Sequence, residues 1–300
     1  MSIIGSSKYG VVQQRIVLLA LLCLILLASR GALAADVLIV GDIQYRQVAD
    51  VSSEIRATLR SQVKEYGTSE ARGKLERLVE REDARVVVAL GLEAVTEALR
   101  LPANIPVVFG LIIAPPKSSR PNVTGVYMST PVSEYIATAR KSLPMLSRFS
   151  VIGSSALMHT LLSADSHATA YRVSTPPELM NTVNRLSDTH ALLLLPDANL
   201  LTASVMENVF LFSFRKNIPV LGVSESNVKQ GALFALVFDP KGMGRQIGEK
   251  VHRIIQGVQP SDIPISPPHR FNLFINTNTA RKMDIAIPDD LLKKARKVYP

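Results

Sequence analysis

Polar side chains that could bind a small molecule follow two neighbouring apolar runs in the C-terminal half of the chain. Asp197 and Asn199 follow the run Ala191–Leu195, and Ser224 and Glu225 follow the next such run. Carboxylates, amides and hydroxyls of this kind can fix the orientation of a ligand by hydrogen bonds. Each can equally be a helix cap, because Asp, Asn and Ser accept hydrogen bonds from the first N–H groups of a helix. Two polar clusters on one sheet edge favour a binding site.

The segments around these clusters predict a strand–helix–strand–helix–strand unit. The continuous apolar run Ala191–Leu195 is typical of a strand buried on both faces of a parallel sheet. Pro219–Gly222 and Ala232–Phe238 predict two further strands. The intervening helix has Asp197 or Asn199 placed to cap its first turn, and its apolar face comprises Leu201, Val205, Val209 and Phe212. Ligands of such units are bound just past the carboxyl ends of the strands.

The N-terminal half shows the same alternation. Val37–Val40, Arg85–Leu90 and Ile105–Phe109 read as buried strands. Helices are predicted between them, one with Ile55, Leu59 and Val63 at four-residue spacing and one with Leu75, Leu78 and Val79 inward. The alternation predicts a doubly wound parallel sheet, so the whole chain is expected to be an α/β protein.

Three loops are expected on one edge of this first sheet, namely Asp42–Gln44, Gly91–Glu93 and Phe109–Ile112. We therefore predict that Tyr45, Gly91, Leu92, Glu93 and Phe109 contribute to the site together with the C-terminal clusters. An aromatic side chain such as Tyr45, Phe109 or Tyr127 is expected to pack on the apolar part of the ligand. The alternative for Glu93 is a surface residue that stabilises the dipole of its own helix.

The remaining elements continue the pattern. Strands are predicted at Phe149–Ile152, Thr169–Val173 and Arg270–Ile275, and helices from Thr130 to Leu143, from Pro177 to Leu186, from Asp239 to Gly257 and from Pro288 to Val298.

Several motifs, in this order, resemble a bacterial family. They are Ile105–Val108, Asn122–Val126, Leu194–Asn199, Asn217–Gly222, Val228–Leu233, Gly244–Gly248, Asn276–Ala280, Ile285–Pro288 and Leu291–Ala295. The family is the ABC-transporter substrate-binding proteins with the type I periplasmic-binding fold, some of which bind aromatic amino acids. The likeness runs from about Ala84 to the C-terminus, and the order of the motifs makes it specific.

The resemblance implies two doubly wound parallel-sheet lobes joined by a three-strand hinge that closes around a solute. The expected crossovers are near Val126–Thr130, Asp239 and Pro267–Phe271. The expected lobes are 35–128 plus 240–266 and 129–239 plus 267–300. In this family a small hydroxyl residue commonly follows the glycine of the loop matching Gly91–Glu93 and helps to hold a ligand carboxylate. Leu92 supplies no hydroxyl, and Glu93 would repel an anion.

The first 34 residues predict an export signal. Lys8 and Arg15 precede the apolar run Ile16–Ser29, and Ala32–Ala34 offers a small-residue cleavage site. Removal of residues 1–34 takes away three basic residues and no acidic one, which lowers the formal net charge from +9 to +6. It also removes Cys23, the only cysteine of the 300 residues. We expect a periplasmic protein without disulfides or thiol chemistry.

The composition and motifs argue against several function classes. The basic residues are scattered and lack interleaved aromatics, so nucleic-acid binding is not expected. The chain has no G-x-S-x-G elbow, phosphate loop or H-E-x-x-H motif, and no histidine pair with a metal-ligand spacing. An enzyme, a cofactor and a metal site are therefore not predicted.

Two functions remain on the sequence. The first is the exported solute-binding component of an ABC importer, which acts as a monomer and delivers a small organic, amino-acid-like solute to an inner-membrane permease with its ATPase. The second is a periplasmic sensory module that reports ligand occupancy to a separate membrane partner through the same hinge. Neither the ligand nor its charge follows from the sequence.

Overall fold

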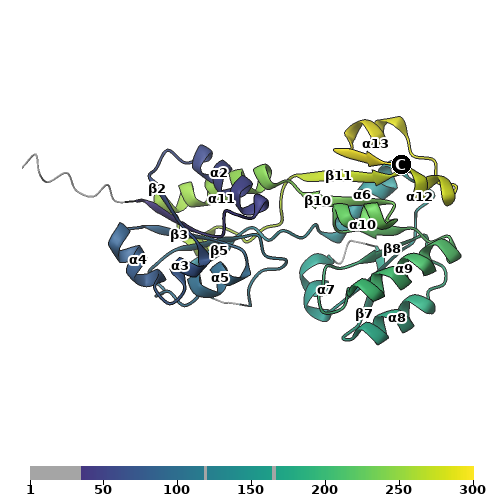
Figure 1. Cartoon of the computed structure of the whole chain (residues 1–300), viewed down its shortest axis with the longest axis horizontal. Helices are drawn as coiled ribbons and strands as arrows, with labels where there is room; N and C mark the ends of the chain where they lie inside the picture. Colours follow the sequence, from purple (N-terminus) through teal and green to yellow (C-terminus); the bar gives the residue numbers. More distant parts are fainter. Residues whose placement is uncertain (1–34, 118–119, 164–166) are drawn as a thin grey trace, which may run out of the picture.

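The structure is a computed structural model that describes residues 35–117, 120–163 and 167–300. The elements form two lobes side by side, each built on its own β-sheet (Figure 1). The expected signal peptide, residues 1–34, lies outside the described residues. Within the described ranges, no helix is both long and apolar enough to span a bilayer.

The first lobe is built on a five-stranded parallel sheet with the order β2-β1-β3-β4-β5. Its strands are β1 (Val37–Val40), β2 (Val63–Tyr66), β3 (Val86–Leu90), β4 (Val107–Gly110) and β5 (Val123–Gly125). β1 and β3 are buried at every position. They read as continuous apolar runs because helices cover both faces of the sheet.

The helices of the first lobe come from two distant parts of the chain. α2 (Arg46–Thr58) and α11 (Pro240–Ile255) pack together on one face, where Ile55 and Ile247 contact the Val37 side of β1. The opposite face carries α3 (Thr68–Ala71), α4 (Leu75–Glu82) and α5 (Leu92–Ala98). Successive residues of β1 therefore enter two different hydrophobic clusters, as the alternation of a strand requires.

The second lobe is built on a seven-stranded sheet with the order β12-β11-β10-β9-β8-β6-β7. Its strands are β6 (Phe149–Gly153), β7 (Ala168–Arg172), β8 (Ala191–Leu194), β9 (Val220–Gly222), β10 (Phe234–Phe238), β11 (Phe271–Asn276) and β12 (Lys297–Tyr299). β11 is antiparallel to β10, whereas the other strand pairs of this sheet are parallel, as expected of a doubly wound lobe. The chain leaves this lobe through β10 and returns to it through β11, so the two neighbouring strands run in opposite directions.

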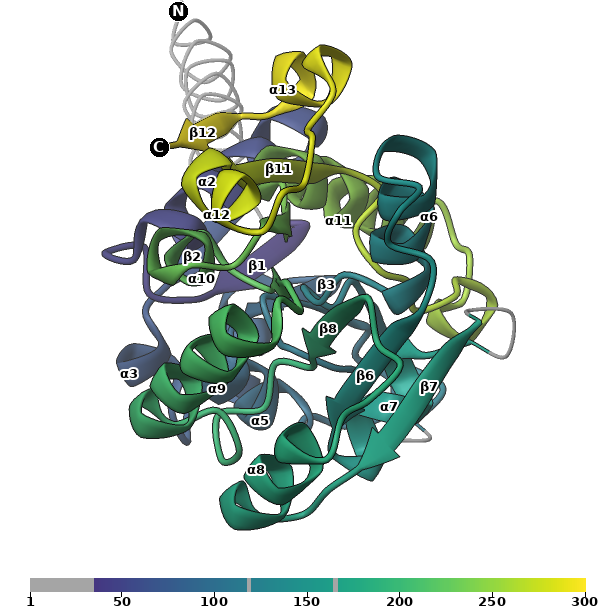
Figure 2. The same ribbon diagram turned by 90° about the vertical axis from the view of Figure 1, so that its right-hand side faces the viewer.

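Helices also cover both faces of the second sheet. α6 (Val132–Ser142), α7 (Ser155–Leu161), α12 (Thr277–Lys282) and α13 (Asp289–Lys294) contribute to one cluster. α8 (Pro176–Asn184), α9 (Ala203–Lys216) and α10 (Glu225–Gln230) contribute to the other. α8 and α9 contact each other, and Figure 2 shows α9 to the left of β8 and β6 and α8 below them. A short 3-10 helix (Pro260–Asp262) precedes β11.

Three sequence-based expectations are wrong. Val63 begins β2 and pairs with Val37, because the chain leaves the α2 helix at Leu59 in an extended conformation. The segment Pro288–Val298 is not one helix: α13 ends at Lys294, and the chain then becomes β12. The cap of α9 is neither Asp197 nor Asn199.

The α9 cap lies a few residues further along the chain. The side chain of Thr202 accepts a hydrogen bond from the N–H of Val205. Asp197 instead accepts from the N–H of Asn199 at 3.0 Å, which makes a local turn after β8. The predicted cap of α11 is confirmed, since Asp239 accepts from the N–H of Gly242 at 3.1 Å.

Three segments connect the lobes, as the resemblance implied (Figure 1). The first links β5 to α6, the second links β10 to α11, and the third leads into β11. They are hydrogen-bonded to one another: Tyr127 N–H donates to Ser266 at 3.3 Å, and Asp239 N–H donates to Arg270 at 3.0 Å. The division into lobes at 35–128 plus 240–266 and 129–239 plus 267–300 stays a prediction.

The contact between α2 and α11 depends on glycine. A Cβ atom built on Gly244 would lie 2.6 Å from the carbonyl oxygen of Val51, and one on Gly248 would lie 2.8 Å from the Thr58 side chain. Gly244→Ala should therefore lower the stability measured by urea denaturation by about 1–2 kcal/mol, because a Cβ against a backbone oxygen should cost the upper part of the about 1–3 kcal/mol range for overpacking, less the ~1 kcal/mol helix preference of alanine.

Gly242→Ala is the matched control, because its Cβ would meet its nearest atoms at 3.2 Å in the same helix. Its loss of stability should be smaller. A Gly244→Ala protein as stable as the wild type would contradict the close-packing account.

Candidate ligand-binding site

The carboxyl edges of the two sheets face each other. β5 leaves the first sheet and runs directly towards the second lobe, so its parallel neighbours β4, β3 and β1 also end on that side. β10 leaves the second sheet towards α11 of the first lobe, so β9, β8 and β6 end facing the first lobe. Ligands of open α/β sheets bind at such edges, beside the point where the strand order reverses.

The strand order reverses at equivalent places in the two sheets. In the first sheet the reversal lies between β1 and β3, and in the second between β6 and β8. The loops that follow these strands begin at Gly41, Gly91, Ser154 and Leu195. The topology thus directs four loops, two from each lobe, into the space between the lobes.

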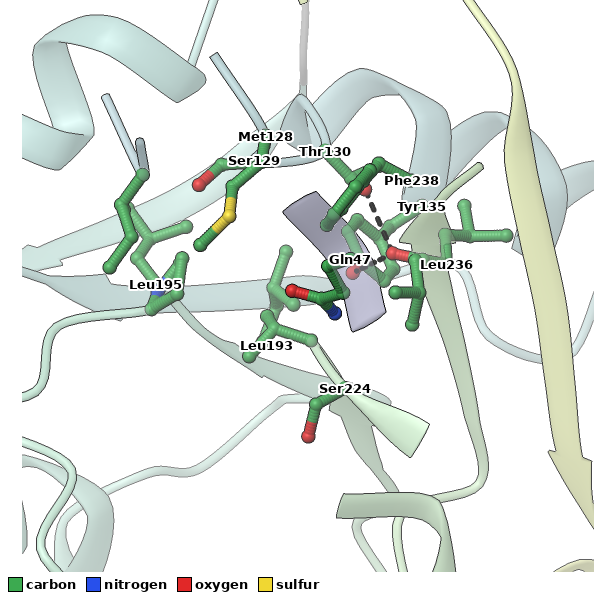
Figure 3. A pocket seen from close by; sticks show the side chains of 14 residues that line it. Gln47, Met128, Ser129, Thr130, Tyr135, Leu193, Leu195, Ser224, Leu236 and Phe238 are labelled. Atoms are coloured by element: carbon green, nitrogen blue, oxygen red, sulfur yellow. Dashed lines mark hydrogen bonds between the residues drawn. The ribbon is translucent and has the colours of Figure 1, made fainter. Parts of the chain in front are cut away.

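A cavity of about 250 Å³ lies between the lobes (Figure 3). Its lining comes from α2, the loop after β4, the first connection, α6 and the ends of β8, β9 and β10. The lining residues are Gln47, Ile113, Met128, Ser129, Thr130, Tyr135, Leu193, Leu195, Pro196, Val223, Ser224, Leu236, Val237 and Phe238. Both lobes and the first connection therefore contribute to this cavity.

Tyr135 anchors the wall of this cavity on the second lobe. Its side chain is buried, and its hydroxyl lies 3.0 Å from the carbonyl oxygens of both Gly222 and Leu236. Its ring stacks on Phe234 with centroids 6.2 Å apart. Burial raises the pKa of Tyr135 well above its ordinary value, so the phenol stays neutral. Thr130 donates to the same Leu236 carbonyl at 2.8 Å (Figure 3).

The structure places Ser224 on the cavity. Its hydroxyl also accepts from the N–H of Asn227 at 3.2 Å, so it caps α10 as well. Asp197 is half-buried and directly follows the lining residue Pro196, whereas Asn199 is exposed in the same turn. Neither Asp197 nor Asn199 lines the cavity.

Glu225 is engaged with the C-terminal strand. The hydroxyl of Tyr299 donates to its carboxylate, and this hydrogen bond lowers the pKa of Glu225. Lys229 and Lys297 lie 3.6 and 4.0 Å from the same oxygen. This network joins α10 to β12, and Glu225 does not line the cavity.

The predicted residues of the first lobe lie on its carboxyl edge but do not line the cavity. Leu92 is 73% exposed and Tyr45 62% exposed. Glu93 forms an exposed ion pair with Arg72 at 2.7 Å, and Gly91 opens α5 with a φ of 95°, which favours glycine. Phe109 is fully buried in β4 against the backbone of Gly125.

Sequence reasoning missed most of the lining. Ser129 and Thr130 belong to the first connection and Leu236 to β10, and both segments were predicted without any contact to a ligand. Tyr135 reads as an ordinary apolar position of a helix, and Gln47 is the second residue of α2 with no signal that it approaches the second lobe. Among the described residues, no group of three or more His, Cys, Asp or Glu side chains is arranged to hold a metal ion.

Comparison with known proteins gives matches over most of the chain. A family model described as "ABC transporter substrate binding protein" matches residues 61–299. A tyrosine-binding protein of Clostridioides difficile (strain R20291) is 23% identical over 174 residues, which are 55% of this chain and 50% of that protein. An uncharacterized protein of Rickettsia prowazekii (strain Madrid E) is 35% identical over 79 residues, 26% of each chain. The matches thus span half or less of these relatives.

Solved structures share the fold. A ligand-free, open substrate-binding protein with adhesive properties from Clostridium difficile gives a TM-score of 0.65 at 15% identity, covering 88% of this chain and 99% of that one. A domain from Streptococcus pneumonia in complex with L-Trp gives 0.53 at 18% identity, with the same coverage. These likenesses confirm the two-lobed α/β fold.

The buried Tyr135 hydroxyl generates a testable expectation. Tyr135→Phe keeps the ring contact with Phe234 but leaves the carbonyl of Gly222 without this donor, so the free energy of unfolding should fall by about 1–3 kcal/mol in urea denaturation.

The control is Tyr127→Phe, a buried tyrosine whose hydroxyl has no hydrogen bond within the described part of the chain; its stability should change by about 0.5 kcal/mol at most. Equal effects of the two variants would contradict the role given to the Tyr135 hydroxyl.

Proposed function

This chain belongs to the ABC-transporter substrate-binding protein family, and we propose that it is an exported protein that closes two lobes on a small organic solute. It then delivers the solute to an inner-membrane permease with its ATPase. The observation that carries the proposal is the cavity between the lobes, lined by both carboxyl edges and by the first of the three connections.

The size of the cavity supports a closing motion. Its volume of about 250 Å³ is small for a binding site. Sites for drug-sized ligands measure about 300–1,000 Å³. The remaining contacts would come from the exposed first-lobe edge, where Tyr45 and Leu92 present apolar surface. Closure would bring this edge onto a solute held by Ser224 and the cavity wall.

The lining supports binding rather than catalysis. The described cavity residues include no carboxylate, imidazole, amine or thiol that could transfer a proton or attack a substrate. The phenol of the lining, that of Tyr135, is buried and bound to main-chain carbonyls. Transport of a solute requires none of these groups, because its free energy comes from the ATPase partner.

The relatives suggest which chemical class of ligand to consider first. One curated relative is named for tyrosine binding, and one similar structure holds L-Trp. We extend to this chain only the broader class, a small organic solute that is amino-acid-like or related. Residues 1–34 are proposed to direct the protein to the periplasm, where it acts as a monomer without nucleic acid.

A thermal-shift screen of residues 35–300 against amino acids, amines, organic acids, nucleosides and sugars tests the proposal. A ligand at one hundred times its dissociation constant should add about 2.7 kcal/mol to the free energy of unfolding, which gives a clear rise in melting temperature. Melting temperatures unchanged across all classes would contradict a solute-binding role.

Ser224→Ala separates the cavity contact from the cap. It should cost about 1 kcal/mol of stability through the lost cap and should also weaken binding of the solute found in the screen. Thr202→Ala is the matched control, because Thr202 caps α9 in the same way but does not line the cavity. Unchanged affinity in Ser224→Ala would show that Ser224 is a cap only. The measurements are thermal melting and calorimetric titration.

A further inference from the structure

The cavity between the lobes has no charged lining. Nine of its fourteen lining residues are apolar, and the other five are Gln47, Ser129, Thr130, Tyr135 and Ser224. Figure 3 shows the aliphatic and sulfur-containing side chains of Leu193, Leu195 and Met128 around the opening. The part of a ligand that enters this cavity therefore meets apolar surface and neutral hydrogen-bonding groups.

Two of the five polar groups are unable to donate to a ligand. Tyr135 donates its hydroxyl proton to main-chain carbonyls, and Thr130 donates its own to Leu236. Neutral donors remain on Gln47, Ser129 and Ser224. A carboxylate placed here would lose its water without gaining an opposite charge, which is unfavourable in a partly buried site.

The neighbouring edge of the first lobe is acidic. A second cavity of about 380 Å³ at the ends of β1 and β2 is lined by Asp42, Glu65 and Glu70 and by no lysine or arginine. Arg56, which lies outside this lining, pairs with Glu65 at 3.3 Å, and Arg72 is paired with Glu93. On the second-lobe side, the half-buried charge beside the cavity is Asp197. These carboxylates repel anions and attract cations.

Large apolar side chains accompany the carboxylates on this edge. Ile43 is 57% exposed, Tyr45 62% and Leu92 73%. Such side chains are normally covered, and here they follow β1 and β3, on the side that faces the second lobe. The closing surface thus combines apolar contacts with negative charge.

We propose that the cleft selects solutes with an apolar body that are uncharged or positively charged, and that it discriminates against solutes with a free carboxylate. The proposal rests on the solute-binding function and names its substrate class. A protein that holds an amino acid by its carboxylate would differ from this chain in the charges of its cleft. Apolar amines and alcohols are compatible with the neutral cavity and the acidic edge of this cleft, whereas the corresponding amino acids are not.

Matched probes test the selection. Each set shares one apolar body and differs in its head group: L-tyrosine, tyramine and tyrosol; L-tryptophan, tryptamine and tryptophol; L-leucine, 3-methylbutylamine and 3-methylbutanol. Calorimetric titration of the protein produced from the full chain should give, in at least one set, an amine or alcohol that binds about tenfold or more tightly than the amino acid.

Two results would overturn the proposal: an amino acid that binds as tightly as the other members of its set, or no binding by any probe. In either case a hit from another solute class in the wider screen would leave the solute-binding function intact. Only the absence of binding by every probe and by every solute of the wider screen would contradict both the solute selectivity and the solute-binding function.

Asp42→Asn tests the acidic edge. For a set in which the amine binds, the ratio of amine to alcohol affinity should fall about twofold or more, because the substitution removes one negative charge from that edge. Glu80→Gln makes the same charge change on the exposed face of α4, away from the cleft, and should leave the ratio unchanged. An unchanged ratio in Asp42→Asn would overturn the electrostatic part of the proposal.

Discussion

The direction in which parallel strands leave each sheet constrains the whole molecule. β5 passes out of the first sheet into the second lobe, and β10 passes the other way, so every parallel neighbour ends facing the opposite lobe. Two carboxyl edges, each with a reversal of strand order, are thereby brought face to face. The cavity, the capping residue Ser224 and the acidic first-lobe edge all owe their positions to this arrangement.

The rigid and adjustable parts of the protein are separated. Within each lobe, strands such as β3 and β8 are buried at every position and offer no easy change of conformation. Between the lobes, the connections are held to one another by a few hydrogen bonds, such as those from Tyr127 to Ser266 and from Asp239 to Arg270. A motion that changes the cleft would alter these connections and leave the sheets intact.

The sequence predicts the lobes well because burial on both faces leaves continuous apolar runs, as in Val37–Val40 and Ala191–Leu195. The prediction from sequence fails where the spacing of apolar residues fits both a helix and a strand, or where an element depends on a pairing partner elsewhere in the chain. Val63 fits a helical period and an edge strand equally well, and β12 depends on pairing with β11 rather than on its own basic residues. Of the cavity lining, only Ser224 was among the predicted site residues, since Gln47 and Tyr135 meet only after the connections are folded. Phe109 was expected to contact ligand, but a strand in this sheet buries both its faces.

The position of α11 has a consequence for the order in which the protein is made. The helix that covers one face of the first lobe comes from residues 240–255, so a growing chain exposes Val51 and Ile55 of α2 until the second lobe has been synthesised. The first lobe is therefore unable to complete its core during synthesis of the N-terminal half, although domains usually fold as units in that order. Late completion leaves the first lobe unable to close its core before residue 255 has been made, a property that would suit the exported protein proposed above.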